Sequence, residues 1–160
     1  MNVFSVEMGK YVSAFVPIDT TGAGQTGDYV NLKHYRRCAI ILQSGAWAGG
    51  TAAVTLNQAT SAAGGSAKAL AFTRYWLYTA LTSDDPVLTT VTSNTFNITA
   101  ANKTHVIEVH VNDLDINNNF YWLNVATATP GANADLLVGN YYLYDAAHSM
   151  KADDSPTVIA

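Results

Sequence analysis

Charge is the scarcest property of this sequence. Charged residues make up 12% of its 160 residues, against about 25% in an average soluble domain. The eight Lys and Arg residues are scattered, so no basic stripe is available to neutralise phosphates, and we expect no binding to nucleic acid. A weakly charged surface is easily desolvated, as in a subunit that lies against other subunits.

Cysteine and long apolar runs are also scarce. Cys38 is the single cysteine, which excludes an internal disulfide and suits synthesis in a reducing cytoplasm. No apolar run approaches the roughly 20 residues of a membrane helix, so no membrane association is expected. The first 15 residues lack a charged region followed by a continuous apolar core, and we therefore expect no secretory signal.

Runs of β-branched and aromatic residues dominate what is present, most clearly from His105 to Tyr144. Such side chains pack well on a pleated surface, and the Asn, Asp, Gly and Pro clusters between the runs supply tight turns. The pattern predicts roughly eight to ten short strands. The clearest are expected at residues 29–32, 37–42, 52–59, 87–91, 95–98, 106–111, 120–125 and 136–144.

Three segments need separate interpretation. Residues 37–42 (RCAIIL) are almost uniformly apolar, as expected of a strand that is covered on both faces. Residues 44–51 (SGAWAGGT) are predicted to be a turn. Residues 68–81 fit either a short helix or two strands, and their aromatic residues favour strands.

These features predict an all-β fold, an antiparallel β-sandwich or jelly roll in a single domain. A chain of this size buries roughly 70% of the surface that it exposes when unfolded, so it requires no disulfide or metal for stability. We expect an N-terminal arm and first strand in residues 1–20, the β-domain in 21–145 and a tail in 146–160.

Asp113, Asp115 and Asn117 have the spacing that opens a calcium-binding EF-hand loop. The later positions do not fit this motif, because Asn118 stands in place of the turn glycine and Asn124 in place of the closing glutamate. We therefore interpret the segment as a turn between two strands that is rich in Asp and Asn.

Two pairs of side chains could carry chemistry. Glu108 and His110 lie two residues apart in an expected strand, hence on one face, where a solvent-facing cross-strand pair is favoured over a metal site. His34 and Cys38 hold the groups of a cysteine nucleophile, but Cys38 opens an apolar run and is typical of a small buried residue. We predict no catalytic residue, cofactor or metal, and no enzymatic activity.

The aromatic residues allow two interpretations. Trp47, Trp76 and Trp122, with the nine tyrosines, could form a platform for carbohydrate, but aromatic residues in strands belong more often to a core or a subunit interface. Tyr141 and Tyr142 are adjacent in an expected strand, so one is buried and the other faces outward. An outward tyrosine is a good anchor for a partner protein.

Six segments occur in a characteristic order: GDYVNLK (27–33), AGGTAAVTLNQAT (48–60), AKALAFT (67–73), THVIEV (104–109), NDLDINNNF (112–120) and PGANAD (130–135). In this order the chain resembles a family of small virion proteins of tailed bacteriophages, the capsid decoration (cement) or auxiliary head proteins. The resemblance covers about residues 27–145. It implies a β-sandwich or jelly roll, a homotrimer over local threefold positions of the shell, and no catalytic residues.

From the resemblance we expect a structural protein on the exterior of the virion capsid that binds and stabilises the lattice of the major capsid protein. The alternatives are another virion component at the head–tail junction or tail, a carbohydrate-binding β-sandwich, or a jelly-roll hydrolase. Residues 1–15 and 155–160 are expected to reach neighbours by strand addition. The residues expected to contact partners are Val3, Phe4, Tyr11, Trp47, Tyr141, Val158 and Ile159.

Overall fold

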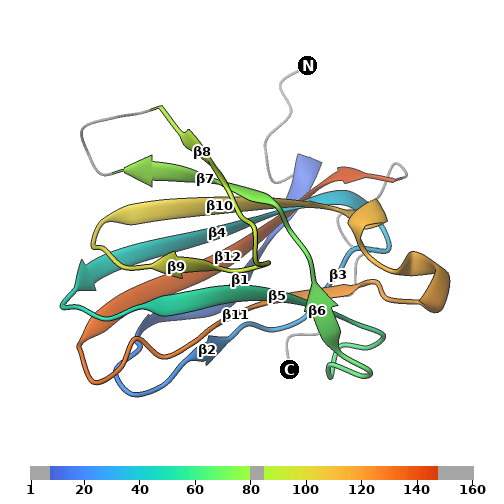
Figure 1. Cartoon of the computed structure of the whole chain (residues 1–160). Coiled ribbons are helices and arrows are strands. Elements are labelled where there is room, and N and C mark those ends of the chain that lie inside the picture. The colour runs from blue at the N-terminus through green and yellow to red at the C-terminus, as the bar shows by residue number, and fades with distance from the viewer. Residues whose placement is uncertain (1–7, 80–84, 148–160) are drawn as a thin grey trace.

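Two antiparallel sheets pack face to face in the computed structural model of this chain (Figure 1). The structure describes residues 8–79 and 85–147. Sheet A contains, in spatial order, β1 (Gly9–Asp19), β12 (Asp135–Ala146), β4 (Tyr35–Trp47), β10 (Lys103–His110), β7 (Arg74–Thr79) and β8 (Val87–Thr90). Sheet B contains β2 (Gln25–Thr26), β11 (Trp122–Thr127), β5 (Ala52–Ala59) and β6 (Lys68–Leu70), while β3 (Val30–Asn31) pairs with β11 and β9 (Phe96–Ile98) pairs with β5. The predicted single-domain, antiparallel β-sandwich is confirmed.

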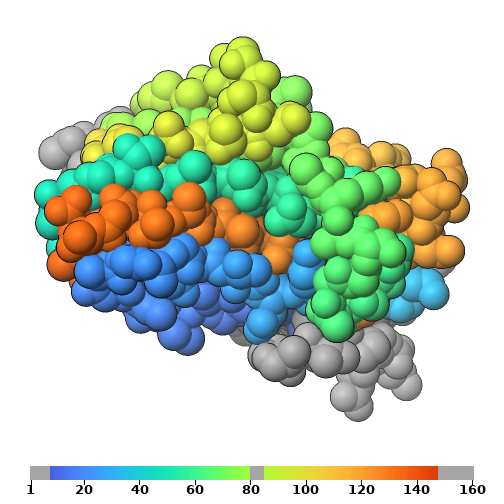
Figure 2. Space-filling model, turned by 60° about the horizontal axis from the view of Figure 1, so that its bottom comes forward, coloured from blue at the N-terminus to red at the C-terminus, as the bar shows by residue number. Residues whose placement is uncertain are grey.

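Strands that are far apart in the sequence lie side by side in both sheets. The last described strand, β12, lies between β1 and β4 and pairs with both. On the other side of the molecule, blue, orange and teal segments form adjacent bands in Figure 2, as expected from the order of β2, β11 and β5 in sheet B. This topology brings residues from several segments onto each face.

The core lies between the sheets and follows from the period-two alternation of the strands. Ile40 and Leu42 of β4 and Ile107 of β10 point inward from sheet A and are fully buried. Leu56 and Leu123 meet them from sheet B with at most 1% exposure. Burying each such side chain is worth about 1.5–3 kcal/mol, so these alternating residues hold the sheets together.

Most predicted strands are present, and two boundaries change. The aromatic run is strand, as predicted, and forms β6 and β7. β4 continues to Trp47, so the turn predicted at residues 44–51 is shorter than expected. The strand continues because residues 44–47 pair with β10 and β12. Similarly, residues 9–15 of the expected N-terminal arm belong to β1, which pairs with β12.

Candidate interaction surface

The outer face of sheet A carries an unusual number of large apolar side chains. Cross-strand register places four of them in one line across neighbouring strands, and we call this line the apolar row: Ile41 of β4, Val106 of β10, Trp76 of β7 and Leu88 of β8. The chain neighbours of Ile41 and Val106 are buried, whereas the four residues of the row are half-buried or exposed. A continuous apolar line on an outer face is a candidate surface for binding.

Three tyrosines form a stacked ladder beside the apolar row. The rings of Tyr11 and Tyr142 lie with centroids 4.3 Å apart, and those of Tyr142 and Tyr144 lie 5.3 Å apart at an interplanar angle of 9°. Tyr11 belongs to β1 and the other two to β12, where alternation directs both to the outer face. Stacking fixes the orientation of these rings before any partner binds.

Charged residues gather at one end of this face. The Arg37 guanidinium lies 3.5 Å from the Glu108 carboxylate, which also accepts a hydrogen bond from the Tyr144 hydroxyl. Arg36 and Asp145 form a further ion pair at 3.7 Å. Exposed pairs of this kind each contribute at most about 1 kcal/mol to stability, so their more important effect is to hold Glu108 and Tyr144 in position.

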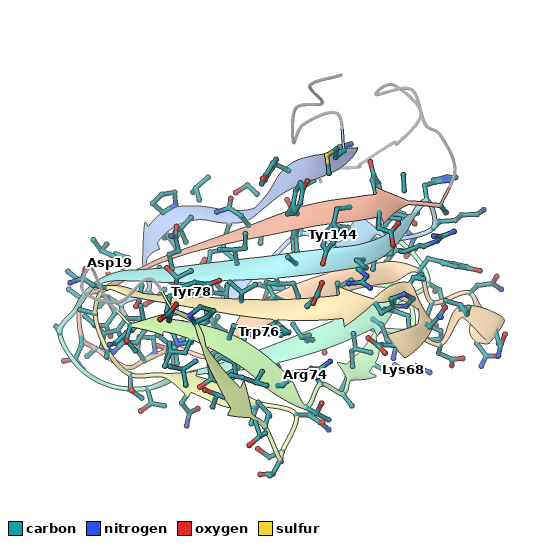
Figure 3. All side chains as sticks on the ribbon, turned by 90° about the horizontal axis from the view of Figure 1, so that it is seen from above. Asp19, Lys68, Arg74, Trp76, Tyr78 and Tyr144 are labelled. Carbon is teal, nitrogen blue, oxygen red and sulfur yellow. The ribbon has the colours of Figure 1, made fainter. Side chains whose placement is uncertain are left out.

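Two adjoining hollows lie on the same face, over the strands seen in Figure 3. The aromatic hollow, of about 250 Å³, is lined by Ala39, Trp76, Tyr78, Pro86, Val106, Glu108 and Tyr144. The charged hollow, of about 240 Å³, is lined by Arg37, Arg74, Trp76, Glu108, His110 and Asp113. Trp76 and Glu108 line both hollows, so together they form the boundary between an apolar and a polar compartment.

The residues expected to contact partners fall into three groups. Tyr11 is 55% exposed on β1. Trp47 is half-buried at the end of β4, where it packs against the core and donates a hydrogen bond to the Gly50 carbonyl oxygen. Val3, Phe4, Val158 and Ile159 lie outside the described residues.

Tyr141 requires a correction. One tyrosine of the adjacent pair is buried and the other faces outward, as predicted, but Tyr141 is the buried one, with no exposed surface. Its hydroxyl accepts a hydrogen bond from the Val125 backbone N–H of sheet B. Because this contact crosses the core, Tyr141 joins the two sheets, and the outward residue of the pair is Tyr142.

The members of the two candidate pairs differ in burial and in their contacts. Cys38 is fully buried, as the sequence indicated, and burial raises the pKa of its thiol far above the ordinary value. Glu108 and His110 share the outer face, as predicted, but Glu108 pairs with Arg37. The His110 Nδ1 atom accepts a hydrogen bond from the Asn112 backbone N–H.

The Asp- and Asn-rich segment forms two short 3-10 turns, η2 (Val111–Asp113) and η3 (Ile116–Asn118). Asp115 pairs with Lys68 at 2.5 Å and accepts hydrogen bonds from Asn118. The Lys68 contact is the main cause that holds the pKa of Asp115 below its usual value. The predicted turn is therefore confirmed, and the Asp115 carboxylate binds Asn118 within the turn and Lys68 of β6.

Two features are absent from residues 8–79 and 85–147. No group of three or more His, Cys, Asp or Glu side chains in these ranges is arranged to hold a metal ion. Within the same ranges, no helix is long and apolar enough to cross a membrane.

Sequence reasoning did not identify the apolar row or the hollows. Their members come from five strands, and only the register between β4, β10 and β7 reveals that Ile41, Val106 and Trp76 are neighbours. A local signal was nevertheless present. Trp76 and Tyr78, like Tyr142 and Tyr144, are spaced two residues apart, the spacing of side chains on one face of a strand.

Comparison with known proteins assigns the chain to no family. Neither a family model nor a curated protein sequence matches the chain. A solved structure that is similar is the crystal structure of SPBc2 prophage-derived protein YomS, with a TM-score of 0.47 and 8% sequence identity. The match covers 84% of this chain and 92% of that protein. A likeness of this degree carries no inference about function.

Proposed function

We propose that this chain is a capsid decoration protein of a tailed bacteriophage, which binds the assembled lattice of the major capsid protein on the virion exterior. The order of segments that resembles this family supports the proposal. The structural observation that carries it is the apolar edge of β1, which borders the tyrosine ladder. A protein that binds only the assembled lattice stabilises that lattice by mass action.

The edge formed by β1 has the properties of a docking strand. β1 pairs with β12 on one side, and no second strand among the described residues pairs with its other side. Three large apolar residues in or directly before this strand are exposed: Met8 (59%), which precedes β1, and Tyr11 (55%) and Val16 (64%) within it. An unpaired strand edge with apolar side chains can accept an extended segment of a partner through backbone hydrogen bonds.

Only half of this edge suits strand addition. Register shifts between Ser13 and Phe15 and between Phe15 and Ile18 interrupt the second half of β1, which also contains Pro17. Bulges and proline hinder pairing at an edge. The regular half, from Gly9 to Ser13, therefore remains as the docking segment, with Tyr11 at its centre.

Binding of the protein to purified capsids tests the proposal. Empty shells assembled from the major capsid protein are mixed with the purified chain, and the bound fraction is measured by co-sedimentation. We expect the paired substitutions Met8→Ser and Tyr11→Ser to weaken attachment about tenfold or more, because they remove exposed apolar side chains directly before and within the docking segment. Many copies on a symmetric shell would amplify this change.

The opposite edge of sheet A supplies a matched control. Val87 and Leu88 of β8 are 55% and 52% exposed, close to the exposure of Tyr11. The substitutions Val87→Ser and Leu88→Ser should leave attachment within about twofold of the unmodified protein. If the unmodified chain does not bind the shells, the proposed function is wrong, and equal losses at both edges would contradict the assignment to β1.

The proposal includes a homotrimer, which the family resemblance implies. Several modest contacts per trimer would act together, because the first contact raises the effective concentration of the others. Mass measurement of the free protein and of the capsid-bound layer tests this part. A ring of another symmetry would instead favour a component of the head–tail junction or tail.

A further inference from the structure

We propose that the aromatic hollow and the charged hollow together bind a short, neutral saccharide. The site lies on the outer face of sheet A and uses Trp76 as a stacking platform, with Glu108 as a hydrogen-bond acceptor. This inference does not depend on attachment to a capsid, because the proposed docking strand is β1 and the site is centred on β7 and β10.

The aromatic hollow provides a surface for the apolar face of a sugar ring. Trp76 and Tyr78 project from β7, and Tyr144 projects from β12 on the far side (Figure 3). Ala39 and Val106 form the floor, and the small side chain of Ala39 keeps the space above it open. The C–H groups of a pyranose ring pack on aromatic faces, while its hydroxyl groups point outward to polar partners.

Glu108 is placed to accept hydrogen bonds from those hydroxyl groups. Both of its described contacts, with Arg37 and with the Tyr144 hydroxyl, use the Oε1 atom. Within the described residues, Oε2 has no hydrogen-bond partner and retains its acceptor capacity. Because two neighbours already fix the carboxylate, a ligand would meet a pre-organised acceptor.

The charges around the site favour a neutral ligand. The charged hollow contains Arg37 and Arg74 as cations and Glu108 and Asp113 as anions. These formal charges balance, so neither an anionic nor a cationic saccharide gains a large electrostatic advantage. The guanidinium of Arg74 lies 5.8 Å from the Trp76 ring centroid, which also helps to orient that ring.

The positions of Trp76 and Tyr144 on strands that are not neighbours argue against a cage for a quaternary ammonium group. β10 and β4 lie between β7 and β12, so the strands that carry Trp76 and Tyr144 are about 14 Å apart. A cation must lie within about 6 Å of each ring centroid to gain from all of them. The volume of the aromatic hollow, about 250 Å³, is below the range of about 300–1,000 Å³ for drug-sized ligands. This volume limits the ligand in the aromatic hollow to a small group. A single sugar ring in this hollow, with a second ring over the charged hollow, fits these dimensions.

Direct binding measurements with purified protein test the inference. The probes are neutral disaccharides of glucose, galactose, mannose, rhamnose and N-acetylglucosamine, with sialyllactose as the anionic comparison and tetramethylammonium as the cationic one. We expect at least one neutral disaccharide to bind in calorimetric titration. Trp76→Ala should then weaken binding about tenfold, and Glu108→Gln by a smaller factor.

Two further variants separate loss of the site from loss of the fold. Ala39→Leu should fill the floor and weaken binding while every stacking residue remains. Trp122→Ala removes a half-buried tryptophan from β11 of sheet B and should leave binding within about twofold. Circular dichroism melting of each variant confirms folding.

Three results would overturn the inference. These are the absence of binding by every neutral disaccharide at about 10 mM, binding that Trp76→Ala and Ala39→Leu leave unchanged, or preferential binding of tetramethylammonium. Failure here with normal attachment to capsids would leave the proposed function intact. If the protein binds a saccharide but does not attach to capsids, the proposed capsid function is wrong and the saccharide inference stands.

Discussion

A buried histidine should make the stability of this protein depend on pH. His105 of β10 is 4% exposed and lies between the sheets, with its ring 5.2 Å from that of Phe96 and 5.6 Å from that of Tyr75. Among residues 8–79 and 85–147, no atom is a hydrogen-bond partner of its Nδ1 atom. Burial lowers the pKa of His105 from 6.5 to about 4, Lys103 adds to this effect, and a hydrogen bond with the Leu42 backbone opposes it.

The sign and size of the effect follow from this pKa. Between pH 6.5 and about 4 the unfolded chain binds a proton at His105 and the folded chain does not, so the free energy of unfolding decreases as the pH falls. One pKa unit corresponds to about 1.36 kcal/mol. The full effect is therefore about 3 kcal/mol, of which about 2.5 kcal/mol is lost between about pH 7.5 and pH 4.5.

Urea titrations at several pH values measure this loss. In the unmodified protein the free energy of unfolding should fall along the predicted curve. His105→Phe should be nearly flat over the same range, even though loss of the hydrogen bond with Leu42 lowers its stability by about 1 kcal/mol. His110→Gln, on the outer face, serves as the control and should keep the original slope. An equal slope in His105→Phe would refute the reasoning.

Two further predictions concern the backbone and the contact between the sheets. Tyr141→Phe leaves the Val125 N–H without its partner, and denaturant titration should show a loss of about 1–3 kcal/mol. Gly50→Ala should cost about 2 kcal/mol or more, because φ is +86° and the added Cβ would clash with the Pro130 carbonyl oxygen. Gly22→Ala, at φ +71° with open space around it, should cost less. Equal losses in the two glycine variants would rule out the clash.

Local pattern was sufficient to locate strands. Residues 52–59 form β5 with the predicted bounds, because strict alternation and small-residue turns at both ends are all local signals. The assignment of strands to sheets was not available locally. β8 and β9 are consecutive in the sequence, yet β8 pairs with β7 in sheet A and β9 pairs with β5 in sheet B.

The direction in which each strand faces also depends on distant partners. Alternation in β12 required one of Tyr141 and Tyr142 to be buried, but it could not decide which. The contact from Tyr141 to Val125 of the other sheet decides it. A shift of one residue would expose Tyr141 and move Tyr142 and Tyr144 into the core. The tyrosine ladder is therefore positioned by a residue that does not belong to it.

The two faces of the RCAIIL segment in β4 are covered to different degrees. The sequence suggested cover on both faces, and the inner side chains Cys38, Ile40 and Leu42 are indeed fully buried. The outer side chains, those of Ala39 and Ile41, are only half-buried.

 Neighbouring strands account for this partial cover, because β4 lies between β10 and β12, which place Glu108 and Tyr142 beside Ala39 and place Val106 and Asn140 beside Ile41.

The order of the tyrosine rings on the outer face of sheet A also favours binding of a partner. The tyrosine ladder is ordered by stacking, and Tyr144 is held further by its hydrogen bond to Glu108. A tyrosine has only two side-chain torsions to restrict, so a partner that meets these rings loses little conformational entropy on binding. The stacking contacts and the hydrogen bond to Glu108 therefore prepare the outer face of sheet A for a partner.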